Sequence, residues 1–383
     1  TLAYPGDGGT VDFLNRAFGG GKFTGAANIL LLLSYVVLVA VYAYAFGSYA
    51  ADLFPAQHQA FWQTVLTNGV IVGLLAINVF ASRLVIRSEN LFNLLKMILL
   101  VGFIGVGLAS PMDWSNLNPS HAVSPTGLVA GAMLIFLNYE GFELIANASK
   151  DVENPRKSLP IAYIGGVVIA IVLYVLIVAV VLGHMSLEQV SKSQDTALSA
   201  AGRILLGPVG YYAIVIAAIM ATSSAINATF FSTGRLTYIV AKTGQLPQEL
   251  ERSIWGEHAE GTVICAIIAL LVANFAPLEA IATMGSAGFL ILFFLVNMAS
   301  VRLARQTGAN LWVSLLAAAS TAGALVILCV TVAENPATRN HLWILVGMIG
   351  VSVFAEIIYR GATGRHIHLR PSPKAPKAQA PVR

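Results

Sequence analysis

The stretch Phe136-Leu-Asn-Tyr-Glu-Gly-Phe-Glu143 decides the fold of this chain, together with the charged segment that follows it as far as Arg156. It places two carboxylates, aromatic side chains and a glycine inside an otherwise apolar run. A continuous helix that faces lipid has no use for this mixture. A helix interrupted in mid-membrane does, because its freed N–H and C=O groups need partners and its carboxylates need water or a cation. The stretch therefore predicts a broken membrane helix that holds a polar solute, as in a transporter.

The composition of the whole chain agrees with a membrane protein. Of 383 residues, 57% are hydrophobic and only 10% are charged, and the mean hydropathy is +0.77. A soluble domain carries about 25% charged residues, so we predict an all-α, polytopic membrane protein. The net charge of +4 does not indicate nucleic-acid binding, because the basic residues lie in loops and in the tail. Cys265 and Cys329 lie in apolar runs and are interpreted as core residues, not as a disulfide or a metal site.

A helix needs roughly 20 apolar residues to cross the hydrocarbon layer. The hydropathy pattern predicts about ten transmembrane helices. They run near residues 25–50, 60–82, 89–109, 125–147, 159–183, 208–241, 261–276, 279–302, 311–333 and 341–360.

The distribution of basic residues predicts the orientation. With these spans, 18 of the 22 Lys and Arg residues lie on one side, and only Lys192, Arg203 and Arg339 lie on the other. Positive loops face the cytoplasm. We therefore expect a multi-pass protein of the cytoplasmic membrane with both ends of this chain cytoplasmic. Residues 361–383, rich in Pro, Ala and Lys, are expected to form a disordered tail. Its charges either contact anionic lipid or only reflect the orientation.

Four segments together resemble a known family. They are Tyr4-Pro-Gly-Asp-Gly-Gly9 with Phe13-Leu-Asn-Arg-Ala-Phe-Gly19, Gly141-Phe-Glu143 with Glu153-Asn-Pro-Arg156, Ala221-Thr-Ser-Ser-Ala-Ile-Asn227 with Gly234-Arg-Leu-Thr-Tyr238, and the run from Arg83 to Lys96. In order and spacing, the chain resembles the amino acid–polyamine–organocation (APC) superfamily of permeases.

The resemblance implies a LeuT-like fold of twelve helices, in which the first ten form two inverted five-helix repeats. The chain matches this plan from the end of the second helix. Residues 1–24 would be a cytoplasmic loop and short helix, and 25–360 would be a transporter domain matching helices three to twelve. The first helix, whose glycine-rich break normally holds the substrate's carboxylate and ammonium, has no counterpart in this sequence. We expect an N-terminally truncated fragment of a longer product or, less readily, a ten-helix variant.

By the same resemblance, the segment from Tyr139 to Glu143 is the unwound middle of helix six. Gly141 would let the backbone leave helical geometry and approach a ligand. The substrate-binding residues expected from this resemblance, with one tyrosine of the first span here, are Phe136, Tyr139, Gly141, Phe142 and Tyr42.

Glu143 matches a family carboxylate that is sometimes tied to gating or proton sensing. A buried carboxylate can exchange a proton near neutral pH, so Glu143 is a candidate proton carrier. The alternative is that Glu143 only accepts hydrogen bonds from the broken backbone. Glu140 is interpreted as accessory, since it need not face the cavity.

Lys96 is the second candidate coupling residue. It lies seven residues beyond Glu89, or roughly 10 Å into the membrane at 1.5 Å per residue. A charge at such depth costs about 3 kcal/mol or more. In some members of the family, a lysine at this place replaces a bound sodium ion. The resemblance thus implies proton coupling at Lys96, with Ser223 and Ser224 as hydrogen-bond partners. The alternative is a lysine that extends back to the interface.

These observations favour a secondary transporter for amino acids or related amines, coupled to protons. An exchanger and a non-transporting sensor with the same fold remain alternatives. A primary pump is excluded within this chain, because no Gly-x-x-x-x-Gly-Lys-Ser/Thr motif is present. An intramembrane enzyme is disfavoured, since no His lies deep in a predicted span. We expect no cofactor and no metal site. The expected partners are a small-molecule substrate, protons and the lipid bilayer, with no nucleic acid. The aromatic lining favours neutral amino acids, and the two carboxylates leave a cationic substrate open.

Overall fold

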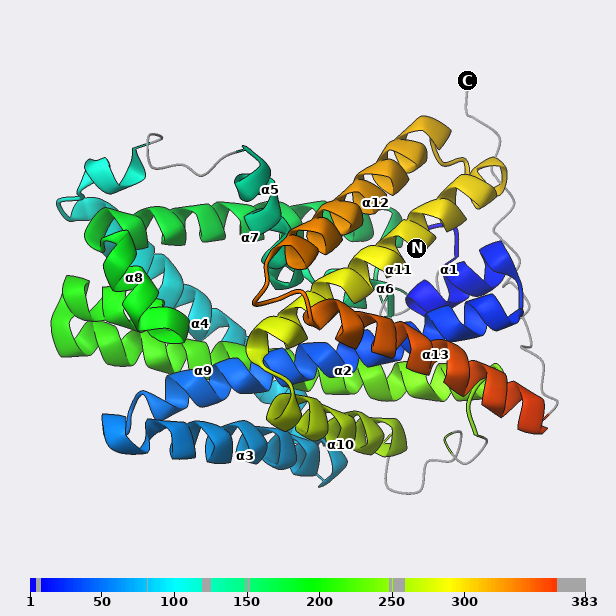
Figure 1. The fold of residues 1–383 in the computed structure, drawn as a ribbon, viewed down its shortest axis with the longest axis horizontal. Helices are drawn as coiled ribbons and strands as arrows, with labels where there is room; N and C mark the ends of the chain where they lie inside the picture. Colours follow the sequence, from blue (N-terminus) through cyan, green and yellow to red (C-terminus); the bar gives the residue numbers. More distant parts are fainter. Residues whose placement is uncertain are drawn as a thin grey trace.

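The computed structural model describes residues 1–4, 8–80, 82–118, 125–147, 149, 152–247, 250 and 259–363 (Figure 1). Of the predicted disordered tail, 361–383, the first three residues form the end of α13 and those from 364 onward lie outside the described residues. Lys150 and Arg252 of the basic loops also lie outside them. Helices account for most of the described chain. They are α1 (Gly9–Phe18), α2 (Lys22–Ala51), η1 (Ala56–His58), α3 (Gln59–Phe80), α4 (Ser82–Ala109), η2 (Trp114–Leu117), α5 (Pro125–Leu134), η4 (Phe136–Tyr139), α6 (Leu144–Asn147), α7 (Pro155–His184), α8 (Leu187–Ser193), η6 (Gln194–Thr196), α9 (Ala197–Lys242), α10 (Ala259–Phe275), α11 (Leu278–Thr307), α12 (Leu311–Glu334) and α13 (His341–Thr363).

Eight helices of the described chain are long and apolar enough to cross a membrane, and nine spans result if a bent pair counts as one. The bent pair lies in the predicted span 125–147, where residues 127–133 and 136–146 meet at 52°. The predicted span 261–276 corresponds to α10, which has 17 residues and is shorter than the roughly 20 that a perpendicular span needs. The protein is therefore an all-α, multi-pass membrane protein, as predicted.

Helix α2 lies at the centre of the molecule (Figure 1). It packs against α9, α3, α11, α13 and α10. In its most apolar window 56% of the residues are buried, compared with 11% in α7. Its sequence explains this position, since no charged residue occurs between Lys22 and Asp52. A helix that is apolar on all sides is stable only inside a protein or in lipid.

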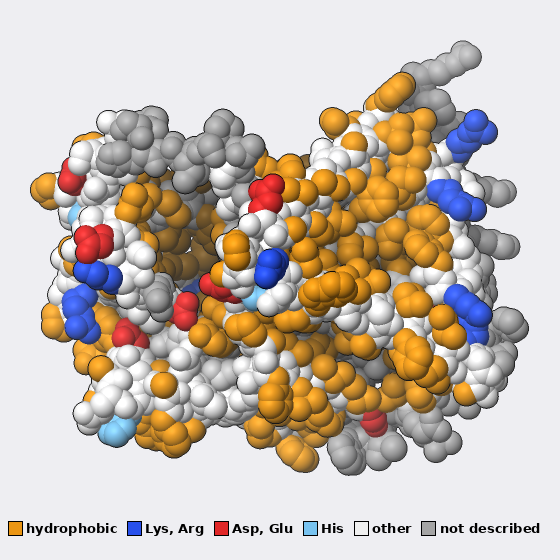
Figure 2. All heavy atoms as spheres, viewed as in Figure 1, with side chains coloured by type: hydrophobic (Ala, Val, Ile, Leu, Met, Phe, Trp, Pro, Cys, Tyr) orange, Lys and Arg blue, Asp and Glu red, His pale blue; other side chains and the backbone are white. Residues whose placement is uncertain are grey.

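The outer surface is apolar, as lipid requires. Figure 2 shows hydrophobic side chains over most of the visible face, with most of the visible Lys and Arg side chains near its two ends. Large side chains such as Phe80, Phe275 and Trp312 are 86%, 84% and 78% exposed. Exposed apolar patches of this extent mark a surface that contacts another apolar phase, which here is the bilayer.

Helix α9 is two helical segments joined at a kink. Leu206 and Gly207 have non-helical backbone angles, and Pro208 follows them. Gly207 has a φ of +59°, a conformation that glycine adopts without steric cost. The sequence predicted a span that begins at residue 208. The structure adds the preceding segment from Ala197, which folds back over the end of the span.

Candidate functional site

The predicted interruption is present between α5 and α6. Helix α5 ends at Leu134, η4 forms one tight turn, and Glu140 is extended with φ −74° and ψ 157°. Gly141 then takes a φ of +114°, which a residue with a Cβ atom adopts only at a cost. The chain resumes helical geometry at Leu144. Gly141 is thus the residue that lets the backbone leave the helix and return to it.

The backbone groups freed by this break find partners on three sides. The N–H of Leu137 donates to Oγ of Ser286 on α11 at 3.2 Å. The N–H of Gly141 donates to Oε2 of Glu143 at 2.8 Å. The hydroxyl of Tyr174 on α7 donates to the carbonyl of Asn138 at 2.9 Å. Unpaired backbone groups are costly away from water, so these bonds stabilise the interruption.

The carboxylates of the break are only partly satisfied. Glu143 is 6% exposed. One of its oxygens accepts from Gly141, while Oε1 is buried and has no hydrogen-bond partner among the described residues. Both carboxylate oxygens of Glu140 are also buried and have no partner in this part of the chain. Glu143 therefore does satisfy the broken backbone, as the simpler alternative required, but one oxygen remains for a proton or a ligand.

The structure gives Glu140 a larger part in the site than the sequence indicated. It was interpreted as accessory, yet its carboxylate is buried and lies close enough to that of Glu143 for the two charges to interact. Tyr42 of α2 also lies within the electrostatic range of both carboxylates. Burial of an ionised carboxylate without a partner is very costly in free energy. This pair would therefore be stabilised by a proton, a cation or an ammonium group.

The predicted aromatic residues divide into two groups. Phe136 and Phe142 both pack against Phe293 of α11, with ring centroids 6.1 and 5.3 Å apart. Tyr139 instead packs edge-on against Tyr174 of α7, at 5.2 Å. Phe293 was not predicted as a site residue, because it lies 151 residues beyond Phe142 in the chain. The break is therefore lined by rings from its own segment, from α7 and from α11.

Two glycines of α11 allow close contact with the break and with α2. A Cβ atom on Gly285 would stand 2.6 Å from Leu137 in η4, and one on Gly288 would stand 2.7 Å from Oγ of Ser34. Real Cβ atoms essentially never approach so closely. Ser286 between them provides the oxygen that accepts from the N–H of Leu137. The segment 285–288 is thus a close helix crossing that also holds the break in place.

Lys96 lies on α4, and α4 packs against α9. Oγ of Ser224 donates to Oδ1 of Asn93 at 3.4 Å, and Lys96 is one helical turn further along α4. Ser223 is partly buried on the same stretch of α9. The structure therefore brings Ser224 to the predicted helix pair, although the hydrogen bond it shows involves Asn93. Lys96 and the two serines lie on α4 and α9, whereas the two carboxylates lie in the break between α5 and α6.

Asn227, one turn beyond Ser223 on α9, contacts a different helix from Ser224. Nδ2 of Asn78 on α3 donates to Oδ1 of Asn227 at 2.7 Å. Asn227 is one turn beyond Ser223 but is buried toward α3. This amide pair links two helices inside the membrane, where such bonds are worth roughly 0.6–2 kcal/mol.

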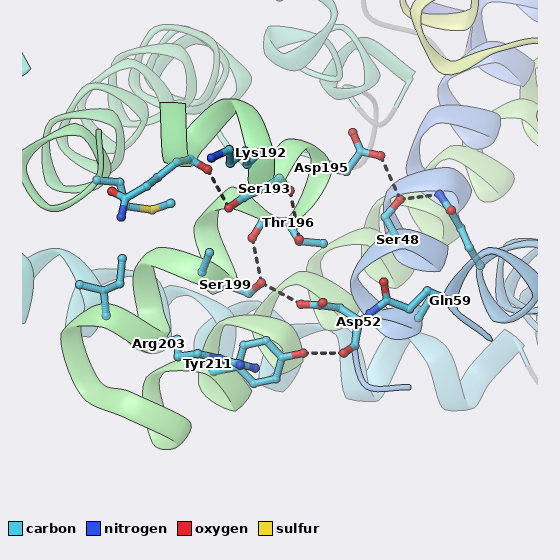
Figure 3. Close-up of a pocket in the computed structure, with 16 residues that line it drawn as sticks. Ser48, Asp52, Gln59, Lys192, Ser193, Asp195, Thr196, Ser199, Arg203 and Tyr211 are labelled. Atoms are coloured by element: carbon cyan, nitrogen blue, oxygen red, sulfur yellow. Dashed lines mark hydrogen bonds between the residues drawn. The ribbon is translucent and has the colours of Figure 1, made fainter. Parts of the chain in front are cut away.

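A polar pocket lies beyond the Asp52 end of α2 (Figure 3). Its volume is about 650 Å³. We call it the α8-end pocket, and its lining residues are Ser48, Ala51, Asp52, Gln59, Gln63, Met185, Gln189, Lys192, Ser193, Asp195, Thr196, Ser199, Ala200, Arg203, Ile204 and Tyr211. Tyr42 lies ten residues before Asp52 on α2, or about 15 Å along the helix axis.

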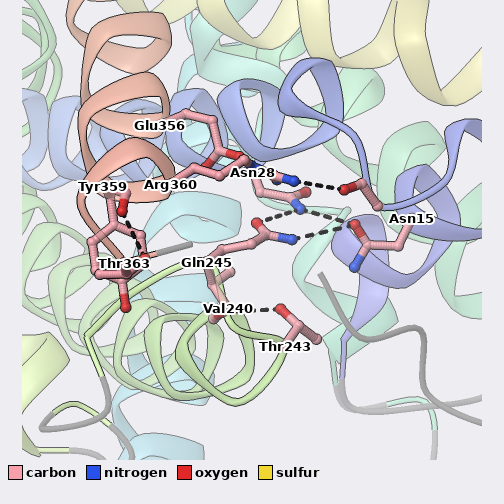
Figure 4. Close-up of polar contacts among 10 residues, drawn as sticks. Asn15, Asn28, Val240, Thr243, Gln245, Glu356, Tyr359, Arg360 and Thr363 are labelled. Carbon is pink, nitrogen blue, oxygen red and sulfur yellow. Dashed lines mark hydrogen bonds and ion pairs between the residues drawn. The ribbon is translucent and has the colours of Figure 1, made fainter. Parts of the chain in front are cut away.

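The opposite end of α2 is closed by buried amides (Figure 4). Nδ2 of Asn28 donates to Oδ1 of Asn15 at 3.1 Å and to Oε1 of Gln245 at 2.8 Å. These three side chains are 4% exposed or less. Beside them, Arg360 pairs with Glu356 and donates to the carbonyl of Gly20 at 3.0 Å. These contacts join α1, α2 and α13 to the turn that follows α9, whereas the pocket of about 650 Å³ lies at the α8 end.

Comparison with known proteins places the chain in a family. Residues 1–354 match the sequence profile of the amino acid permease family. The inner membrane transport protein YbaT of Escherichia coli is 30% identical over 372 residues, covering 94% of this chain and 84% of that protein. The branched-chain amino acid permease BcaP of Lactococcus lactis is 27% identical over 333 residues, covering 80% of this chain and 70% of BcaP. The cationic amino acid transporter 5 of Arabidopsis thaliana is 25% identical over 312 residues, covering 77% of this chain and 53% of that transporter.

The family profile spans most of the chain, and the helical architecture agrees with a membrane transporter. The chain belongs to the amino acid permease family of the APC superfamily and is an amino acid transporter, not an enzyme.

Proposed function

We propose that this protein is a secondary active transporter that couples the uptake of an amino acid or related amine to an inward flow of protons. It would lie in the cytoplasmic membrane with the α1 end inside and the α8 end outside. The charge bias of the loops supports this orientation, since Lys192, Arg203 and Arg339 are the only basic residues assigned to the outer side.

The observation that carries the proposal is that the two carboxylate oxygens of Glu143 differ in their hydrogen bonding. One oxygen accepts from the N–H of Gly141, and the other is buried and has no partner within the part of the chain that the structure describes. A proton on the unpartnered oxygen would neutralise the group without disturbing the hydrogen bond. Loss of that proton would leave a buried charge, which is stabilised only if the break rearranges or a cation arrives. Protonation and backbone geometry are thereby linked at the substrate site.

Lys96 would supply the second protonation step. A lysine can release its proton when it is desolvated, and Lys96 is half-buried near the contact between α4 and α9. Ser223 and Ser224 supply hydroxyl groups on the facing helix. In this proposal, the ammonium form holds α4 and α9 together and the neutral form releases them.

The substrate would bind at the break, near Phe136, Tyr139, Gly141, Phe142 and Tyr42. The rings of Phe136, Phe142 and Phe293 provide an apolar surface for a neutral side chain. The unpartnered carboxylate of Glu140 provides a place for an ammonium group. The relatives' names include both branched-chain and cationic amino acids, which fits a site with both features.

Two alternatives share this site. An exchanger would move substrate only against internal substrate, and a sensor would bind without transport. The deciding experiment places the full-length protein in proteoliposomes and measures uptake of labelled leucine, lysine and putrescine with an inward proton gradient on or off. Accumulation that depends on the gradient supports the proposal. Uptake that requires internal substrate indicates an exchanger, and saturable binding without uptake indicates a sensor.

A further inference from the structure

The α8-end pocket contains a guanidinium group that is not ion-paired within the described chain. The guanidinium carbon of Arg203 lies over the ring of Tyr211, 4.0 Å from its centroid. Within the described chain the N–H donors of Arg203 make no hydrogen bond, so they are available to a ligand. Lys192 differs, because its ammonium already pairs with Glu188 at 2.6 Å. Arg203 is therefore the group in this pocket that is suited to a carboxylate.

The same pocket contains two carboxylates with unused oxygens. Oδ2 of Asp52 accepts from Oγ of Ser199 at 3.2 Å. Oδ2 of Asp195 accepts from Oγ of Ser48 at 3.4 Å. Within the described residues, the second oxygen of each aspartate accepts no hydrogen bond. In Figure 3, Asp195 and Ser48 lie on one side of the pocket and Arg203 and Tyr211 on the other.

One hydrogen bond fixes the segment that carries Arg203 relative to the end of α2. The hydroxyl of Tyr211 donates to the backbone carbonyl of Asp52 at 2.7 Å. This bond fastens the segment that carries Arg203 to the end of α2. Because Arg203 stacks on the same ring, its position relative to the aspartates is set without a direct ion pair. A molecule with one negative and one positive end can therefore bridge the pocket.

We propose that the α8-end pocket is a second binding site, which takes the zwitterionic backbone of an amino acid. Its carboxylate binds Arg203, and its ammonium binds Asp195 or Asp52. The volume of about 650 Å³ lies in the range of small-molecule sites, roughly 300–1,000 Å³. Because Arg203 and Asp195 are exposed, water screens their charges, and binding is expected to be weak, roughly millimolar.

This site is separate from the helix break. Asp52 is about 15 Å along α2 from Tyr42, which is more than the length of one amino acid. A substrate held here would be concentrated on the outer side before it reaches the break. The assignment rests on the charges of the pocket and does not require that the proton coupling proposed above be correct.

The test uses a reporter inside the pocket and needs no transport. Gln189 is exposed and lines the pocket, and Gln189→Cys provides a thiol there. The free cysteines Cys265 and Cys329 are replaced by alanine in the full-length protein. A membrane-impermeant methanethiosulfonate reagent then modifies the new thiol. The rate is measured with L-leucine, with L-leucinamide, which lacks the carboxylate, and with N-acetyl-L-leucine, which lacks the ammonium.

L-leucine at about 10 mM, ten times the expected dissociation constant, should slow modification at least fivefold, and the two analogues should slow it less than twofold. Arg203→Gln should abolish the protection. Arg339→Gln removes an exposed arginine outside this pocket and should keep it. Gly141→Val, which distorts the helix break, should also keep it, even if uptake is lost.

The proposal would be overturned by no slowing with L-leucine, by equal slowing with N-acetyl-L-leucine, or by protection that survives in Arg203→Gln. Protection that disappears in Gly141→Val would also overturn it, because the thiol would then report binding at the break. Failure of gradient-driven uptake with protection intact would count against the proposed function alone.

Discussion

The backbone N–H of Gly141 donates a hydrogen bond to Oε2 of Glu143, two residues further along the chain. The positive φ of Gly141 turns this N–H out of the helical ladder, and the carboxylate receives it. The residue that breaks the helix and the residue proposed to carry the proton are therefore joined directly. A substitution of either residue should therefore alter the geometry or the hydrogen bonding of the other.

Glu143→Gln should remove the dependence of uptake on the proton gradient. The amide oxygen of Gln can still accept from Gly141, so the break should persist, but Gln carries no exchangeable acidic proton. We expect gradient-driven accumulation in proteoliposomes to fall at least tenfold, with substrate exchange retained. Glu334→Gln, at an exposed position at the end of α12, is the matched control. Full pH dependence in Glu143→Gln would show that the proton site is elsewhere.

Gly141→Ala should damage the site through the backbone and not through a clash. A Cβ atom on Gly141 has no neighbour within 4 Å, but the φ of +114° is strained for any L-residue. Such strain costs about 1–3 kcal/mol, so we expect lower thermal stability and loss of most substrate binding. Gly165→Ala in α7 also meets nothing within 4 Å and has ordinary helical geometry. It should be neutral or slightly stabilising. Equal effects of the two substitutions would contradict the role of the positive φ.

Glu140→Gln should discriminate between classes of substrate. Its carboxylate has no hydrogen-bond partner among the residues that the structure describes and can pair with the side-chain ammonium of a cationic substrate. We expect the KM for lysine to rise about tenfold, which corresponds to about 1.4 kcal/mol, while the KM for leucine changes less than twofold. Glu140→Asp should restore part of the preference for lysine. If the two KM values rise together, Glu140 does not recognise side-chain charge.

The helix break could be predicted from the sequence because its residues are contiguous. Gly141 and the two glutamates interrupt an apolar run, and a local pattern of this kind reveals a local structure. The role of helix α10 was harder to predict, because its length of 17 residues lies between that of a buried helix and that of a perpendicular span. The segment before Gly207 was missed as part of the α9 unit, since Gly207-Pro208 resembles a helix start.

The contacts between distant segments could not be predicted from one sequence. Asn28 and Gln245 are 217 residues apart, and no pattern in either segment identifies the other as its partner. The same is true of Asp52 and Tyr211, which are 159 apart. An isolated polar residue in an apolar run, such as Asn28, does signal that a partner is needed, but only the fold identifies which one.

Lys96→Arg should separate proton transfer from simple charge. Arginine keeps the positive charge and the length to reach the interface but does not release its proton in proteins. If Lys96 is a coupling residue, both Lys96→Ala and Lys96→Arg should lose gradient-driven accumulation. If it only extends toward the interface, Lys96→Arg should behave as the unmodified protein does. Uptake by Lys242→Ala, at the exposed end of α9, gives the control for loss of a lysine. Normal accumulation in Lys96→Ala would exclude the coupling role altogether.

Asn28→Ala should loosen the closed end of the molecule. The side chain is fully buried, and its Nδ2 donates to both Asn15 and Gln245. Removing it leaves two buried amide oxygens without their best donor, at a cost of about 1–3 kcal/mol. The remaining contact, from Nε2 of Gln245 to Oδ1 of Asn15, is long at 3.5 Å and compensates little. Thermal unfolding in detergent measures the loss, with Asn340→Ala in an exposed loop as the control.

The double variant Asn28→Ala/Gln245→Ala decides whether the amides act as one unit. Residues of one hydrogen-bond network have coupled effects, whereas distant residues have additive ones. Once Asn28 is gone, Gln245 has already lost its 2.8 Å hydrogen bond, so its own removal should cost little more. The double variant should therefore be destabilised by at least 0.5 kcal/mol less than the sum of the single variants. Additive losses would mean that the two amides contribute separately and that the closed end is held by the surrounding apolar packing instead.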